Sequence, residues 1–410
     1  MIAERVTQYR AANEQLLYFT SSSILSDDTH IVFISDRTGH PNLFIRNLSS
    51  GLEKQLTHND EGFLKSYVYF DGTPYRGFGK ASLSLHAQSG TIYYIHSREI
   101  RKVSPEGEEV TLSQYPDGQM TAFTHVSNNG RLLCVPTTDM RAFDNTKQLS
   151  SKADYDIDRR MQDQRLSSYL RVFDTDTGEE IICEQVECCL ITHAQFSPTN
   201  ANLILYNHEW PSDCGIRRMW LFDGTKHRRL RAEGEGRSRK DWACHEMWER
   251  DGTAIIYHGK FSHGPAFVGR VQPDGTGITE IALPPGYKRY GHFTVGNPNV
   301  LVTDGYYEEG SHRRARGGDW ISRVDVNWRE STTHWTPLCR SFSSWESQDA
   351  HPHPIFDHAI HYAYFTSDAD GKRAVYRIGV KKSVEQGAQG DLLPRTNWLS
   401  SWVRRKERPR

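Results

Sequence analysis

The sequence SDDTHIVFISDRTGHPNLFIRNLSSG occupies residues 26–51. It opens with a polar turn, continues through the apolar run HIVFISD (30–36), and after a short loop enters a second apolar run within HPNLFIRNLSSG (40–51). Both runs are short, rich in β-branched and aromatic residues, and bounded by Gly, Asn, Asp and Ser, as β-strands are. The stretch therefore predicts two neighbouring strands joined by a tight loop.

The same order of turn, strand, loop and strand returns along the chain. Seven such modules, spaced by about 55 residues, start near residues 26, 87, 127, 197, 250, 296 and 356. Repeats of this size with several short strands are typical of β-propellers with four-stranded blades. Because one blade cannot bury both of its faces, blades stack on their neighbours until the ring closes. The sequence predicts an all-β fold, a seven-bladed β-propeller, with a two-sheet sandwich or two unrelated β-domains as the alternatives.

No composition shift marks a boundary between domains, so we expect one propeller domain over residues 1–410. A polar segment at about 139–169 interrupts the third module and is predicted to be a helical or irregular insertion. Residues 1–20 are expected to form either a short amphipathic helix or a strand that completes the last blade.

Composition excludes several classes of protein. Lys and Arg number 50 against 51 Asp and Glu, a net charge of −1, which argues against a nucleic-acid partner held by bulk positive charge. No apolar run exceeds four residues, whereas a membrane-spanning helix needs about 20. The first 19 residues lack the apolar core of a secretory signal, and the seven cysteines contain no CxxC pair. We therefore expect a cytoplasmic protein with reduced thiols and no membrane partner.

The most informative side chains are the histidines of Gln348-Asp349-Ala350-His351-Pro352-His353-Pro354. A proline pushes the residue before it towards extended backbone, and in an extended chain residues i and i+2 project to the same side. We expect His351 and His353 both to be extended and to form a rigid pair of imidazoles, to which Gln348 can add a carbonyl oxygen. Solvent-facing histidines of a His-rich chain are the alternative.

A third imidazole is needed to complete a metal site. In a propeller the starts of the innermost strands meet at one end of the central channel, so histidines from different blades can converge there. Several histidines lie at strand ends, and each could instead be a hydrogen-bonded histidine of the strand packing: His193, His208, His245, His258, His263 and His292.

A set of motifs runs through the chain in a distinctive order. It comprises RRMWL (217–221), CHEMW (244–248), DGTA (251–254), GHF (291–293), Trp345, the Gln348–Pro354 element and FTSD (365–368). In this the chain resembles the oligogalacturonate lyases, the seven-bladed propeller enzymes of polysaccharide lyase family 22. The HPHP element with its upstream glutamine is the most specific part, whereas the turn–strand repeats alone would match any TolB-like propeller.

The resemblance implies a manganese-dependent β-elimination on short oligogalacturonides in the cytoplasm. It places metal ligands at His292, Gln348, His351 and His353, with Mn²⁺ as the expected ion and other divalent metals able to bind. It places the general base at His245 and an active-site arginine at Arg218. We assign further substrate contacts to His193, His208, Arg217 and Trp345. Residues 231–242 and 306–320 depart from the family pattern and are expected to shape the sugar subsites.

The chemistry of these residue types agrees with that activity. The proton at C5 of a uronate is weakly acidic because its removal adds a second negative charge beside the carboxylate, and a divalent ion offsets that charge. A histidine is a suitable base near neutral pH, and an arginine can pair with the carboxylate. Hydrolysis would need two flanking carboxylates. Glu246 and Asp349 adjoin site residues, but strand alternation predicts that they point away.

Two alternatives stay open at this stage. One is a lyase of the same mechanism acting on another uronic-acid oligosaccharide. The other is a non-catalytic, TolB-like binding propeller, which would need neither the imidazole pair nor a base. The propeller of a serine peptidase is excluded because no GxSxG motif and no hydrolase domain follow. A homodimer is possible, and the sequence does not decide it.

Overall fold

The computed structural model describes residues 2–64, 77–121, 123–143, 155–209, 218–231, 242–261, 264–283, 291–305 and 320–380. All of these lie in one compact unit, Met1–Val380. Residues 381–410 lie outside the described part, so the single domain over 1–410 stays a prediction there. Among the described residues, no helix combines the length and the apolar character needed to cross a membrane.

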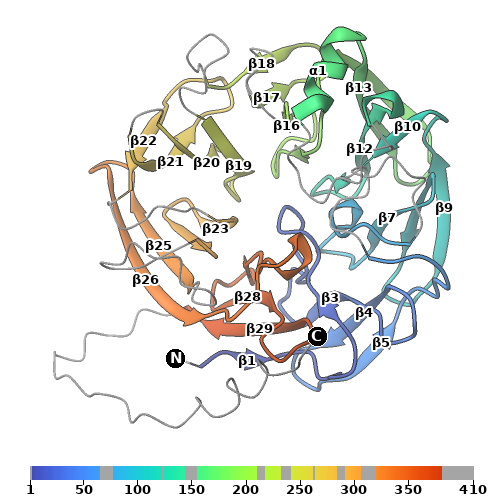
Figure 1. The fold of residues 1–410 in the computed structure, drawn as a ribbon, viewed down its shortest axis with the longest axis vertical. Helices are drawn as coiled ribbons and strands as arrows, with labels where there is room; N and C mark the ends of the chain where they lie inside the picture. Colours follow the sequence, from blue (N-terminus) through green and yellow to red (C-terminus); the bar gives the residue numbers. More distant parts are fainter. Residues whose placement is uncertain are drawn as a thin grey trace, which may run out of the picture. The chain divides into compact units, whose positions relative to one another are not determined.

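The described strands form seven antiparallel sheets arranged as the blades of a ring, as predicted (Figure 1). The first two blades are β2–β5 (Glu14–Gln15, His30–Ser35, Asn42–Asn47, Glu53–Gln55) and β6–β9 (Ser84–Leu85, Ile92–His96, Glu99–Val103, Glu109–Gln114). The third has five strands, β10–β14 (Gln119–Thr121, His125–Val126, Leu132–Asp139, Ser167–Asp174, Glu180–Glu187). The fourth is β15–β18 (Ala194–Phe196, Ile204–Asn207, Met219–Phe222, His227–Arg229).

Three blades complete the ring. The fifth is β19–β22 (Trp242–Trp248, Ile255–Lys260, Ala266–Val271, Thr279–Ala282), and the sixth is β23–β26 (Phe293–Asn297, Val300–Thr303, Trp320–Asn327, Thr332–Arg340). The seventh joins β27–β29 (Ile355–Phe356, Tyr362–Ser367, Ala374–Gly379) to β1 (Glu4–Arg5). The prediction that an N-terminal strand completes the last blade is thus confirmed. This blade combines β1, from the start of the chain, with β27–β29, the last described strands.

Burial explains why the inner strands read as continuous apolar runs. All of β3 after its first residue is buried, because the neighbouring blades cover both faces of the sheet. The outermost strand β14 instead alternates between exposed and half-buried residues, since it forms the outer edge of its blade. The inner and middle strands therefore supply the hydrophobic core. Functional side chains can lie where the innermost strands end at the central channel.

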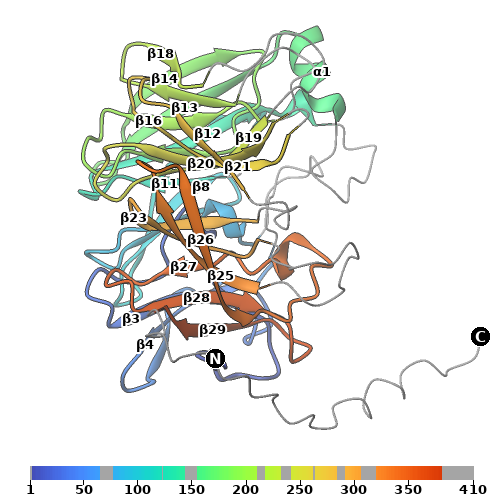
Figure 2. The same cartoon turned by 90° about the vertical axis from the view of Figure 1, so that its left-hand side faces the viewer.

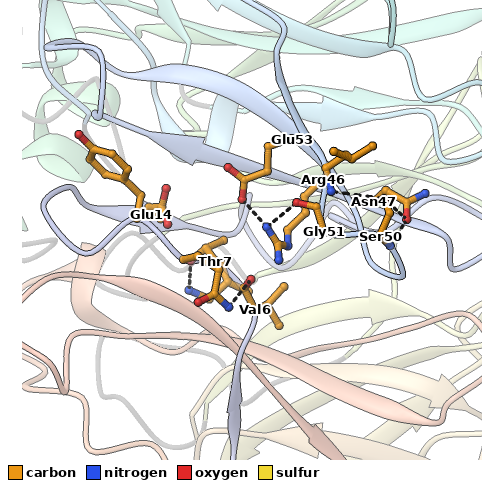
Figure 3. A network of polar contacts seen from close by, with 12 residues as sticks. Val6, Thr7, Glu14, Arg46, Asn47, Ser50, Gly51 and Glu53 are labelled. Atoms are coloured by element: carbon orange, nitrogen blue, oxygen red, sulfur yellow. Dashed lines mark hydrogen bonds and ion pairs between the residues drawn. The ribbon is translucent and has the colours of Figure 1, made fainter.

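Polar contacts pin the turns at the outer side of the blades. In the turn between β4 and β5, Arg46 donates to the carbonyl of Gly51 at 2.9 Å and to Oε1 of Glu53 at 2.7 Å (Figure 3). Asn47 Oδ1 accepts the backbone N–H of Ser50 at 2.8 Å. Gly51 has a φ of +75°, which glycine adopts without a steric penalty.

The predicted insertion at about 139–169 falls between β12 and β13. Its described residues form a short 3₁₀ turn, Met140–Ala142, and the helix α1, Tyr155–Asp163, which lies on one face of the ring (Figure 2). Arg160 Nε donates to the carbonyl of Ala142 at 2.7 Å and ties the helix to the turn. The buried side chains of Ile157 and Met161 join the core.

Candidate metal centre

Three histidines from two blades meet where the innermost strands begin. His292 immediately precedes β23, whereas His351 and His353 lie between the 3₁₀ turn Gln348–Ala350 and β27. One ring nitrogen from each of the three lies within 4.8 Å of the others. The ring centroids of His292 and His353 are 4.0 Å apart, and those of His292 and His351 are 5.3 Å apart. The predicted imidazole pair and the third imidazole thus converge.

A buried carboxylate holds two of these histidines in place. Asp304, just after β24, accepts the backbone N–H of His292 at 2.7 Å and that of His353 at 3.1 Å. Its Oδ2 also lies 3.1 Å from Nδ1 of His292. A carboxylate at Nδ1 fixes the ring orientation and leaves Nε2 as the ligand atom, the usual arrangement behind metal-bound histidines. Burial raises the pKa of Asp304 to about 7, against the opposing effects of His351 and of the two N–H donors.

Asp304 can approach this closely because residue 291 is a glycine. A Cβ at Gly291 would lie 1.9 Å from Oδ1 of Asp304. The motif GHF (291–293) therefore carries two functions, since the glycine admits the carboxylate that orients the histidine. Sequence reasoning did not single out Asp304, although a glycine directly before a candidate ligand indicates a close approach of this kind.

Behind His353 lies a buried lysine. Lys80 Nζ is 3.1 Å from Nδ1 of His353, and the Lys80 side chain has no exposed surface. Burial lowers the pKa of Lys80 to about 8, opposed chiefly by the charge of Asp349. Nε2 of His353 carries the lone pair when Nδ1 keeps the proton and donates it to the neutral amine of Lys80, a form that the lowered pKa of Lys80 favours. Nothing in the local sequence around Lys80 signals this position.

The residues present fit a divalent ion. Within the described part of the chain, Nε2 of His353 and Oε1 of Gln348 are buried and have no hydrogen-bond partner, which is costly unless a ligand uses them. Burial and the neighbouring His292 and Lys80 push the pKa of His353 well below its usual range, so that its lone pair is available. The three imidazoles are neutral donors, and with the amide oxygen of Gln348, which stays a predicted ligand, they would make a mixed N/O set of the kind Mn²⁺ accepts.

The backbone of the HPHP element differs from the prediction. His351 is extended, with φ −74° and ψ 135°, but His353 has a φ of 47° and is in the left-handed region. The expectation that both residues are extended was therefore wrong for His353. The contacts of its N–H with Asp304 and of its ring with Lys80 hold a conformation that the following proline does not dictate.

His245 lies beside this cluster, in a β-bulge. The register of β19 against β20 shifts between Cys244 and Met247, and His245 has a φ of 53°. Its ring centroid is 4.6 Å from that of His292. Nδ1 of His245 lies 2.8 Å from Nε2 of the buried His258 and 3.3 Å from the carbonyl of Gly291. Because a carbonyl can only accept, these contacts favour the tautomer of His245 with the proton on Nδ1 and the lone pair on Nε2.

The same bulge overturns the expected direction of Glu246. The side chain of Glu246 is fully buried and accepts a hydrogen bond from Nε of Arg218 at 2.9 Å. Glu209 accepts a hydrogen bond from Nη1 of the same arginine at 3.0 Å. Two carboxylates thus hold Arg218, and their charges raise its pKa well above the usual value despite burial. The positive charge of Arg218 helps to lower the pKa of His258.

Three comparisons bear on this geometry. No family model matches the chain. An oligogalacturonide lyase of Pectobacterium atrosepticum is 25% identical over 393 residues, which cover 90% of both chains. An oligogalacturonate lyase of Dickeya dadantii is 25% identical over 394 residues, covering 90% of this chain and 91% of the relative. A solved structure of oligogalacturonate lyase in complex with manganese has a TM-score of 0.73 at 21% identity and covers 93% of each chain.

The chain resembles the oligogalacturonate lyases over almost its whole length. The resemblance carried by the ordered motifs and the HPHP element is thereby confirmed. The similarity to the manganese complex shows that the fold is shared, and the metal in that structure's description belongs to that protein.

The other residues predicted to contact substrate lie in different parts of the fold. Trp345 packs on His351 with ring centroids 4.6 Å apart, and His193 packs on Phe123 at 4.4 Å. His208 stacks on Trp220 of its own blade at 4.8 Å, and burial lowers its pKa to about 3. Arg217 and His263 lie outside the described residues, as do 232–241 and 306–319, where the subsite segments were predicted.

The aromatic side chain of Phe19 packs against the histidines of the site. The ring of Phe19 lies 5.2 to 5.6 Å from those of His245, His292 and His353. Phe19 also lines a cavity of about 320 Å³, whose other walls come from the far ends of the inner strands. None of the three clustered histidines lines that cavity, whereas Phe19 lines it and also contacts His292 and His353.

Proposed function

We propose that the protein is a metal-dependent lyase that cleaves short oligogalacturonides by β-elimination across C4–C5 of the uronate. The observation that carries the proposal is the juxtaposition of two parts. The cluster His292, His351 and His353 suits a divalent ion, and His245 lies beside it with its Nδ1 already engaged. The relatives named as oligogalacturonide and oligogalacturonate lyases support the choice of substrate.

The chain's residues divide the work as follows. His292, His351 and His353, with Gln348, would hold Mn²⁺, which when bound acts as a Lewis acid for the uronate carboxylate. His245 accepts the C5 proton at Nε2. His258 and the Gly291 carbonyl keep its ring in the tautomer that makes Nε2 the acceptor.

Electron flow follows from the position of that base. As His245 takes the proton, the C5–H electrons form a C4=C5 double bond and the C4–O bond to the next sugar breaks. The electron pair of that bond stays on the leaving oxygen, which takes up a proton to become a hydroxyl, while His245 later gives up the proton that it accepted. No water is consumed. Glu209 and Glu246 fix the guanidinium of Arg218 in place, and we propose that Arg218 contacts the substrate carboxylate through its remaining N–H donors.

The product distinguishes elimination from hydrolysis. The C4=C5 double bond is conjugated to the carboxylate and absorbs in the ultraviolet, whereas a hydrolysed product does not. We expect saturated tri- or digalacturonate with Mn²⁺ to yield an absorbing product, and a chelator to suppress it. Release of reducing ends without absorbance would contradict the lyase. Cleavage of another uronide in preference to galacturonides would keep the mechanism and replace the substrate.

The setting of the reaction is a further part of the proposal. Among the described residues, Cys134, Cys183, Cys188 and Cys339 are free thiols, which suits a reducing compartment, and we propose the cytoplasm. Fractionation of the producing cell tests this location. The homodimer also stays a prediction, and light scattering of the purified chain would decide it.

A further inference from the structure

A second group of metal-ligating side chains adjoins the histidine cluster. One ligand atom each from Cys244, His245 and His258 lies within 4.8 Å of the other two. The donor set contains a thiol, which the first cluster lacks. The two groups therefore differ in the metals that they prefer.

The strand geometry explains why these three side chains share one side of the sheet. Cys244 in β19 is the direct cross-strand partner of His258 in β20, and such partners project to the same face. Residue 245 would ordinarily project to the opposite face. The bulge after Cys244 and the left-handed φ of His245 turn its ring back, so that Nδ1 comes to 2.8 Å from Nε2 of His258.

We propose that Cys244, His245 and His258 form a site for a thiophilic divalent ion such as Zn²⁺ or Cd²⁺, and that an ion bound there inhibits the enzyme. Tetrahedral Zn²⁺ with thiolate and imidazole ligands needs donor atoms roughly 3.3–3.6 Å apart. The present ligand atoms lie within 4.8 Å of one another, so binding would require the side chains to rotate towards the ion. A Cys-His-His set leaves a fourth position open, as three-ligand zinc sites do.

The surroundings of the site favour the ligating form of each group. Arg218 lies within electrostatic range of Cys244, and a nearby cation stabilises a thiolate. His258 is buried beside Arg218 and His292, which keeps its imidazole neutral. A thiolate selects Zn²⁺ and Cd²⁺ over Mn²⁺, so the manganese expected at the first cluster does not compete well here.

Inhibition follows because His245, a ligand of this site, is also the residue that we propose as the base. An ion at Cys244 and His258 takes a ring nitrogen of His245 and reorients the residue that we propose as the base. This consequence rests on the proposed function. The binding of the ion itself does not, and it is measured without any substrate.

The binding test uses Cd²⁺ alone as the probe. Cadmium bound by a thiolate gives a charge-transfer band in the ultraviolet, which imidazole ligation alone does not produce. We expect one equivalent of Cd²⁺ per chain to develop this band in the wild type and in His351→Ala. Cys244→Ser should lose it, and Cys183→Ser, which changes an exposed cysteine on β14, should retain it. An unchanged band in Cys244→Ser would overturn the proposal.

The activity test separates the two proposals. With Mn²⁺ in excess, added Zn²⁺ should inhibit the wild type, and Cys244→Ser should be at least tenfold less sensitive while keeping its uninhibited turnover. Equal sensitivity of both proteins would overturn the inhibitory site. A cadmium band without cleavage of any uronide would support the thiophilic site and contradict the lyase. Ultraviolet-absorbing product without a cadmium band would support the lyase and contradict the site.

Discussion

At the scale of single residues, the assignment of the base to His245 makes the first prediction. His245→Ala removes the acceptor of the C5 proton, and a positioned base typically contributes 10²–10⁴ in rate, so turnover should fall by about that factor. Mn²⁺ stoichiometry and the far-ultraviolet circular dichroism should not change, because His245 is outside the proposed ligand set. His334→Ala, on the exposed face of β26, is the matched control. Turnover within a few-fold of wild type would assign the base elsewhere.

Asp304 makes the second prediction at this scale. Asp304→Asn preserves the shape of the side chain but replaces one acceptor oxygen by an N–H donor facing the donors of His292 and His353. Loss of a carboxylate behind ligating histidines typically costs 10–100-fold in metal affinity. We expect a drop of about that size for Mn²⁺ in isothermal titration calorimetry. Asp325→Asn in the same blade, paired with Arg323, should bind Mn²⁺ like the wild type. Equal affinity in the two variants would remove Asp304 from the site.

At the scale of elements, the junction before β23 depends on the absence of a side chain at Gly291. Gly291→Ala would place a Cβ 1.9 Å from Oδ1 of Asp304 and 2.8 Å from its carbonyl carbon. Overpacking of this kind costs about 1–3 kcal/mol of unfolding free energy and should displace Asp304 from His292. We therefore expect lower denaturant midpoints together with weaker Mn²⁺ binding.

The matched control for that substitution is Gly379→Ala at the end of β29, where a Cβ would meet no atom within 4 Å. A substitution of this kind should stay within about 0.5 kcal/mol of the wild type. If Gly291→Ala binds Mn²⁺ with wild-type affinity, then Asp304 reaches its partners without the space that the glycine leaves.

At the scale of the whole ring, closure depends on a few N-terminal residues. Strand β1 pairs with β29, and the N–H of the buried Val6 donates to the carbonyl of Val375 at 2.8 Å. Burial of a valine side chain contributes about 1.5–3 kcal/mol and each hydrogen bond about 1 kcal/mol. Deleting residues 2–7 should therefore lower the unfolding free energy by roughly 3–5 kcal/mol and expose the edge of β29.

Chemical denaturation measures this loss, and light scattering detects association through the freed edge. Glu4→Gln serves as the control, because it removes only the exposed ion pair with Arg377, a contact of the kind worth at most about 1 kcal/mol. A deletion that leaves the denaturation midpoint unchanged would show that the ring does not depend on this strand.

The local sequence pattern was sufficient to predict the propeller architecture and part of the candidate metal site. Turn residues and short apolar runs recur at a regular spacing, and this alone predicts stacked blades closed into a ring, because an unpaired blade cannot bury its faces. That histidines would converge was also predictable, since ring topology brings the starts of the innermost strands together, but only the family resemblance selected His292 from six candidates. His292, His351 and His353 stand at such starts.

Only the tertiary structure decided how these histidines are held. Lys80, Asp304 and His258 act through contacts between residues far apart in sequence or through a bulge, and no periodicity in the chain encodes them. The same contacts override local preference at His353, whose left-handed backbone contradicts the influence of the following proline. Local propensities differ by about 1 kcal/mol, whereas a buried donor or acceptor left without a partner costs about 1–3 kcal/mol, so satisfying the buried groups determines the final geometry.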